Sequence, residues 1–122
     1  MRGRIFITGM GIISAIGRDA AETLESLRTS RSGIGPITQL DTIHKGELPA
    51  AEVRLSNQEL AEIAGVAEYQ LTTRTTLLGL IAAREAARHA ALDASAKEFR
   101  TGIVSATTVG GMDKTEIHFK NF

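Results

Sequence analysis

Two short apolar runs and one long helical pattern organise this chain, with glycine-rich connections between them. Residues 4–8 are β-branched and apolar on both faces, which is typical of a strand that helices cover on both sides of a parallel sheet. Residues 101–108 have the same character, whereas residues 74–92 are rich in alanine and leucine, which cost least to hold helical. The order strand, helix, strand predicts a right-handed β-α-β unit. Residues 4–8 and 102–107 should therefore be parallel strands of one sheet, with helix 74–92 packed on it.

Capping boxes predict where the shorter helices begin, because a polar side chain and a glutamate three residues later satisfy free backbone amides. The spacing occurs at Asp19–Glu22, Ser56–Glu59 and Asp113–Glu116. The first helix should cover the sheet with Leu24 and Leu27 and stop near Gly33, while the second should end near Gly65. Glycines and prolines between these two helices predict an irregular connection with one edge strand over residues 48–53.

The predicted helix 74–92 has two different faces. Small side chains at helical spacing would let another backbone approach closely; they are Gly79, Ala82, Ala83, Ala86 and Ala90. Charged side chains share the opposite face, namely Arg84, Glu85, Arg88 and His89. We expect this charged face to be solvated, because Glu85 can pair with Arg88 and His89 within the helix.

Gly9 and Gly11 follow the first predicted strand and supply two of the three glycines of a dinucleotide-binding turn. In that motif the glycines admit a pyrophosphate to a helix N-terminus. Ser14 stands at the third glycine position, and Asp41 lies too far along the chain to hold the ribose. A nucleotide-binding oxidoreductase is therefore one alternative interpretation of this segment.

The same segment also resembles a known family. The run TGMGIISAIG at residues 8–17, followed by SGIGPI at residues 32–37, is similar to the opening of the β-ketoacyl-acyl carrier protein synthases of fatty acid and polyketide synthesis. Residues 51–53, the helix 74–92 and the glycine-containing run 102–112 follow in the family's order and at about its spacing. The resemblance covers the chain from end to end, but only the opening part of a much longer family pattern.

That resemblance implies an α/β chain, the N-terminal portion of a thiolase-like fold with a mostly parallel sheet and covering helices. Residues 1–122 would be one incomplete, truncated domain of an acyltransferase that joins a decarboxylated malonyl unit to an enzyme-bound acyl thioester. The family's cysteine nucleophile and its histidine partners lie beyond the matched motifs, so no catalytic residue is assigned and the segment alone should be inactive. Val109 and Met112 match apolar positions that line the family's acyl-chain pocket near its dimer interface, and they are the predicted substrate-binding residues. Acyl carrier protein, acyl thioesters and a second subunit of a homodimer are the implied partners, and no cofactor is implied.

Composition argues against several other functions. Lys plus Arg (14) balance Asp plus Glu (14), so no strong field would gather nucleic acid or an anionic membrane. The chain has no cysteine for disulfides or thiolate metal sites, and its histidines lack the spacing of metal ligands. His44 and Lys45 lie in a glycine-rich connection and are expected to be solvated. With no targeting segment and no membrane span in the sequence, we expect a cytoplasmic protein.

Ser14 and Ser105 each follow a strand-like run, as a serine nucleophile would, but neither lies in a G-x-S-x-G motif. We expect Ser14 to cap or turn the backbone and Ser105 to be a core strand residue. Two further functions stay open beside the condensing enzyme. One is a non-catalytic, chain-length-setting partner subunit of the same fold, and the other is a bare interaction domain.

Overall fold

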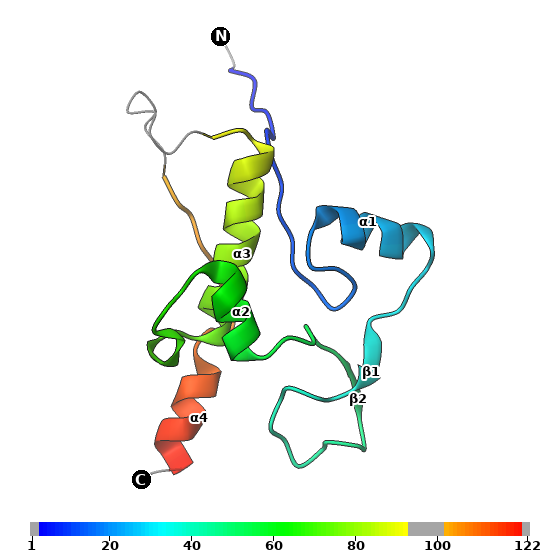
Figure 1. The fold of residues 1–122 in the computed structure, drawn as a ribbon, viewed down its shortest axis with the longest axis vertical. Helices are drawn as coiled ribbons and strands as arrows, with labels where there is room; N and C mark the ends of the chain where they lie inside the picture. Colours follow the sequence, from blue (N-terminus) through cyan, green and yellow to red (C-terminus); the bar gives the residue numbers. More distant parts are fainter. Residues whose placement is uncertain (1–2, 93–101, 121–122) are drawn as a thin grey trace.

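A computed structural model describes residues 3–92 and 102–120 of the chain (Figure 1). Within these residues the elements are, in chain order, α1 (Ala20–Arg28), β1 (Ile34–Pro36), β2 (Pro49–Ala51), α2 (Asn57–Ala64), the 3-10 helix η1 (Tyr69–Leu71), α3 (Arg74–His89) and α4 (Met112–Lys120). Figure 1 shows α3 as the long central helix, with the N-terminal segment running beside it and α1 set to one side. All the helices predicted from the sequence form, and the described residues contain one small sheet beside them.

The apolar core lies between α2 and α3. Its buried members are Leu55, Leu60, Ala61, Ala64, Leu77 and Ile81. Burying a side chain such as Leu60 or Leu77, neither of which is exposed, stabilises the fold by about 1.5 to 3 kcal/mol. The capping box predicted for α2 is complete, since Ser56 and Glu59 bond each other's backbone amides, and Gly65 ends the helix in the left-handed conformation with φ of 62°.

Gly9 and Gly11 let the N-terminal segment lie directly against α3. A Cβ on Gly11 would overlap the carbonyl oxygen of Ala82, and one on Gly9 would lie 2.6 Å from the amide nitrogen of Ala90. Only glycine fits at such an approach of backbone to helix. The small-residue face predicted for this helix is therefore confirmed at Ala82, Ala86 and Ala90, whose partner is the blue segment that runs along α3 in Figure 1. It is not confirmed at Gly79, where a Cβ would meet nothing within 4 Å.

α1 begins as its sequence predicts. The Asp19 carboxylate accepts a 2.8 Å hydrogen bond from the Glu22 amide, and the Glu22 carboxylate accepts one of 2.9 Å from the amide of Arg18. The first bond satisfies one of the free amides of the first turn, and the second fixes the residue just before the cap. The helix ends at Arg28, earlier than the predicted stop at Gly33.

The buried face of α1 differs from the prediction. Leu24 and Leu27 are 47% and 65% exposed, whereas Thr23 and Ser26 are buried. Gly17 explains this orientation, because a Cβ there would lie 2.5 Å from the Thr23 hydroxyl oxygen, so the preceding loop covers this polar face of the helix. The predicted leucine face was therefore wrong, since helical spacing alone does not show which side a closely packed loop covers.

The sheet in the described residues is a two-stranded antiparallel ribbon. β1 pairs with β2 so that Ile34 lies opposite Ala51 and Pro36 lies opposite Pro49. Proline has no amide hydrogen to donate, which limits the ladder at that end. β2 confirms the edge strand predicted over residues 48–53, with shorter bounds, while β1 was not predicted.

The predicted parallel strands are the main correction. Within the described residues, neither 4–8 nor 102–107 forms a strand, no backbone hydrogen bond joins the two segments, and no β-α-β unit is present. Ile7 is 87% exposed and Val104 is fully exposed. A strand requires a hydrogen-bonded neighbour, and these two segments run along different sides of α3 (Figure 1). The prediction of two strands was therefore wrong for this chain, because the described residues supply no neighbouring strand to either segment.

Candidate functional site

α4 and the loop that precedes β2 form the two walls of an apolar groove of about 820 Å³. Ile43 from the loop and Met112 and Phe119 from α4 supply its apolar surface. An ion pair of 3.6 Å between Lys120 and Asp41 bridges the two walls. A groove with mostly apolar walls and a few polar groups can hold a hydrocarbon chain.

The structure places the two predicted substrate-binding residues differently. Met112 is the first residue of α4, is 49% exposed and lines this groove. Val109 is 70% exposed and is not among the groove-lining residues, because the turn at Gly111, with φ of 89°, separates it from α4. Neither residue is part of the buried core of the described residues.

α4 is fixed by contacts with the start of α3. The Asp113 carboxylate accepts a hydrogen bond of 3.2 Å from the amide of Arg74, one of the free amides in the first turn of α3. The Lys114 ammonium donates a 2.8 Å bond to the carbonyl of Gln70. The predicted capping box of Asp113 with Glu116 was therefore wrong, because Asp113 lies inside α4 and satisfies α3 instead.

Glu52 holds the loop that forms the other wall. Its carboxylate accepts a 2.7 Å bond from the Thr38 hydroxyl, bonds of 3.0 and 3.1 Å from the amides of Gln39 and Leu40, and a short bond from the Thr38 amide. Burial alone would raise the pKa of Glu52, but the hydrogen bonds from Thr38, Gln39 and Leu40 outweigh it and lower the pKa to about 2. The carboxylate is thus charged at neutral pH and fixes three successive amides.

Arg74, which the sequence did not single out, joins these parts of the chain. Its guanidinium donates bonds of 2.6 Å to the carbonyl of Val53, 2.8 Å to the carbonyl of Leu55 and 2.9 Å to the side-chain oxygen of Asn57. Its position at the start of the predicted helix is a signal in the sequence, because a positive charge in the first turn is unfavourable beside the positive end of the helix dipole. An arginine in that position therefore indicates partners elsewhere in the chain.

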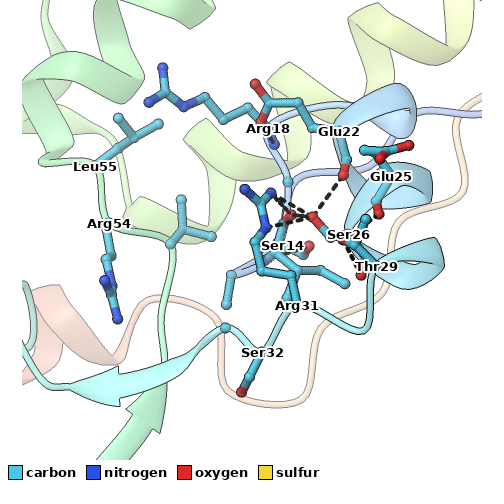
Figure 2. A pocket seen from close by; sticks show the side chains of 15 residues that line it. Ser14, Arg18, Glu22, Glu25, Ser26, Thr29, Arg31, Ser32, Arg54 and Leu55 are labelled. Atoms are coloured by element: carbon cyan, nitrogen blue, oxygen red, sulfur yellow. Dashed lines mark hydrogen bonds between the residues drawn. The ribbon is translucent and has the colours of Figure 1, made fainter.

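A second cavity, of about 520 Å³, lies under α1 (Figure 2). Figure 2 shows Arg31 pointing toward Ser26, with hydrogen bonds of 2.9 Å from Nε to the Ser26 hydroxyl and 2.8 Å from Nη2 to the carbonyl of Ile16. The guanidinium of Arg54, although nearby, points away from Arg31 (Figure 2). The described side chains here bond to one another and to nearby backbone carbonyls. They place no nucleophile beside a general base.

The charged face predicted for α3 is not simply solvated. The Glu85 carboxylate accepts 2.7 Å and 2.8 Å bonds from the amides of Ala20 and Ile12, and the amide of Met10 donates a 3.2 Å bond to Nδ1 of His89. That prediction was wrong for Glu85 and His89, since partners 65 to 79 residues away leave no local signal. These side chains tie the N-terminal turn and the start of α1 to α3.

This geometry argues against a nucleotide site at Gly9 and Gly11. No helix begins directly after them, and the amides of Met10 and Ile12, which would face a phosphate, already donate to side chains of α3. One of those acceptors is the carboxylate of Glu85, which would repel a pyrophosphate. The two glycines serve the close approach to α3 instead.

The remaining candidates show no catalytic arrangement in the described residues. Ser14 turns the backbone as predicted, since its amide donates a 2.8 Å bond to the carbonyl of Gly17, but Ser105 is exposed and the core-strand prediction for it was wrong. His44 and Lys45 are exposed, in agreement with the prediction. Over residues 3–92 and 102–120, no group of three potential metal ligands comes together and no helix has the length and apolar character that crossing a membrane requires.

Comparisons with known proteins agree with the motifs. Residues 2–121 match the family model described as beta-ketoacyl synthase, N-terminal domain. The chain is 35% identical over 118 residues to 3-oxoacyl-[acyl-carrier-protein] synthase 2 of Staphylococcus aureus (strain COL), and 31% identical over 119 residues to nodulation protein E of Rhizobium meliloti (strain 1021). These alignments cover 96% and 95% of this chain but 28% of each relative. No solved structure gives a significant match. The chain belongs to the β-ketoacyl synthase family, whose N-terminal domain it matches over nearly its whole length.

Proposed function

We propose that this chain is the opening segment of a β-ketoacyl-acyl carrier protein synthase. The complete protein would decarboxylate a malonyl group on acyl carrier protein and join the fragment to an enzyme-bound acyl thioester, in fatty acid or polyketide synthesis. We expect it to work as a cytoplasmic homodimer. The observation that carries the proposal is the family match over residues 2–121, and the synthase from Staphylococcus aureus supports it.

The chemistry itself would lie outside these 122 residues. The chain has no cysteine, and a thiolate suits acyl transfer because it both attacks and leaves readily. We therefore expect the isolated chain to form no acyl adduct. Incubation with acyl carrier protein thioesters, followed by intact-mass measurement, tests this point. A stable acyl adduct on any residue would contradict it.

The contribution of this segment would be to the binding of the acyl chain. Met112 lines the groove of about 820 Å³ beside α4, and Val109 lies just before it at the end of an exposed extended segment. In the complete protein we propose that both side chains face the acyl chain. The extended segments 3–8 and 102–107 would there pair with strands from the rest of the protein, which would complete the sheet of the thiolase-like fold.

A chimera tests this proposal. Residues 2–121 would replace the matching segment of the Staphylococcus aureus synthase, and condensation would be measured with acyl carrier proteins that bear acyl chains of increasing length. An active chimera supports the assignment of the segment, while a folded but inactive one contradicts it. The chimera and the unmodified Staphylococcus aureus synthase share the same downstream residues. Any difference in their activity therefore comes from this segment.

Val109→Phe in the chimera tests the binding residues. We expect the longest accepted acyl chain to shorten while short-chain condensation is retained, because a phenyl ring fills part of the pocket away from the reacting atoms. Leu71→Phe is the matched control, since Leu71 is 83% exposed and lies on η1, away from the groove. Unchanged chain-length preference, with stability lower by the ~1 to 3 kcal/mol of overpacking, would show that Val109 packs against protein instead.

A further inference from the structure

We propose that α4 is a hinged lid on the apolar groove of about 820 Å³, and that the ion pair between Asp41 and Lys120 is its latch. The acyl chain is the occupant that the proposed function gives to this groove, and that part of the inference rests on the proposed function. The lid and the latch follow from contacts within this chain. One wall of the groove is tethered on both sides, whereas the other is anchored only near its start.

The loop that forms the first wall is held in place by Glu52. Its carboxylate bonds the three successive amides of residues 38–40, which directly precede the groove-lining residues 41–43. On the other side of those residues, the Lys45 ammonium donates a 3.3 Å bond to the carbonyl of Thr38. Residues 41–43 therefore lie between two tethered points, and this wall should keep its position.

α4 is held in a different way. Figure 1 shows it projecting away from α2 and α3, and none of its residues is buried. Both of its anchors lie in its first turn, where Asp113 bonds the amide of Arg74 and Lys114 bonds the carbonyl of Gln70. Gly111 directly precedes the helix with φ of 89°, a conformation that glycine adopts readily. The helix can therefore pivot about its start.

The ion pair holds the far end of α4. Lys120 is the last residue of the helix, about 12 Å from Met112 at about 1.5 Å per residue. Its ammonium lies 3.6 Å from the Asp41 carboxylate, and the two side chains are 71% and 94% exposed. An exposed pair of this kind is weak, and salt screens it. A pivot of about 30° would move Lys120 by about 6 Å and break the pair.

Lys120 has a second carboxylate within reach when the lid opens. Glu116 lies four residues earlier on α4, which is the spacing at which a glutamate and a following lysine pair along a helix. The ammonium can therefore exchange Asp41, across the groove, for Glu116 on its own helix, so opening the lid costs little. An acyl chain between Ile43 and Phe119 would contact both walls and favour the closed position.

Spin labels can follow the lid, because the chain has no cysteine of its own. His118→Cys on α4 and Leu40→Cys on the loop place labels at exposed positions that do not line the groove. Pulsed electron spin resonance should give a short distance at about 0.02 M salt, and a population about 6 Å longer at about 1 M, where the Debye length is about 3 Å. Leu40→Cys with Leu71→Cys joins the loop to η1 and is the matched pair, whose distance should stay constant.

Two carboxamide substitutions should move the lid in opposite directions. Asp41→Asn removes the latch and should raise the ratio of long to short distances by about two- to fivefold at low salt. Glu116→Gln removes the competing carboxylate and should lower that ratio at high salt. Glu47→Gln is the matched control, since Glu47 pairs with His44 on the same loop and does not line the groove. No response to Asp41→Asn, or a response equal to that of Glu47→Gln, would overturn the latch.

A decanoyl thioester of N-acetylcysteamine tests the occupant separately. Added at about 1 M salt, it should restore the short distance, because the decanoyl chain contacts both walls. If Asp41→Asn opens the lid and the thioester changes no distance, the latch is supported and the acyl chain is contradicted as the occupant of the groove. A lid that keeps one distance under all these conditions would overturn the latch, and the condensation assay of the chimera would still decide the proposed function.

Discussion

Replacing Gly11 by alanine should detach the N-terminal segment from α3. The added Cβ would overlap the carbonyl oxygen of Ala82, which cannot move aside because it belongs to the helix backbone. The cheaper response is release of the segment. That release loses the bond from the Ile12 amide to the charged Glu85 and the bond between Met10 and His89.

The expected loss follows from those two bonds. A hydrogen bond to a charged group contributes about 1.5 to 3 kcal/mol and an ordinary one about 0.5 to 1.5 kcal/mol. We therefore expect Gly11→Ala to lower the free energy of unfolding by about 2 to 4.5 kcal/mol. Gly79→Ala is the matched control, since its Cβ meets nothing and alanine is favoured over glycine inside a helix by about 0.5 to 1 kcal/mol. Replacing glycine by alanine should thus lower the free energy of unfolding at position 11 and raise it at position 79.

Urea titrations followed by circular dichroism at one low protein concentration would measure both variants. Hydrogen exchange of the Ile12 and Ala20 amides would report whether the segment is released, because both donate to Glu85. Gly11→Ala with unchanged stability and unchanged protection of these amides would refute the close-approach argument. Equal destabilisation by Gly79→Ala would refute it as well, since glycine would then matter at both places for another reason.

Three further predictions concern the core, a helix cap and a carboxylate. Leu77→Ala should lower the free energy of unfolding by about 2 to 5 kcal/mol, because it leaves a cavity in the core. Leu80→Ala should lower it clearly less in the same urea titration, because the Leu80 side chain is 36% exposed. Ser56→Ala should cost about 1 kcal/mol by removing the cap of α2, and no change would contradict the capping box. Because the pKa of Glu52 is lowered from 4.5 to about 2, its contribution is complete above about pH 5 and is lost as the pH falls toward 2. Glu52→Gln should therefore flatten the dependence of the urea midpoint on pH between 5 and 3, and parallel curves for the two proteins would contradict this.

The features that the sequence predicts best are those decided within a few residues. Ser56, Glu59 and Gly65 lie within one turn of the ends of α2, and all three act as expected. The start of α1 at Asp19 follows the same local rule. Local geometry is sufficient here because the capping group and the amide that it satisfies are fixed by the same few backbone angles.

The features that could not be predicted depend on partners far along the chain. Residues 4–8 and 102–107 were predicted as parallel strands and form none, because strand pairing depends on a neighbour that a local pattern does not specify. Glu85 was expected to pair along its own helix, and its carboxylate instead binds amides 65 and 73 residues away. In the candidate site, Met112 was identified only by family resemblance, while the roles of Glu52 and Arg74 became visible only when the walls of the groove were assembled.

The bonds from Glu85 to the N-terminal turn have a consequence for synthesis on the ribosome. Chains grow at about 5 to 20 residues per second, so the about 65 residues between Ala20 and Glu85 take roughly 3 to 13 seconds to follow. During that interval the cap of α1 can form from its own residues, but the turn before it has no acceptor. The amides of Met10 and Ile12 likewise wait for His89 and Glu85 of α3. A nascent chain stalled before α3 should therefore exchange these two amide hydrogens rapidly, and one stalled after α3 should protect them.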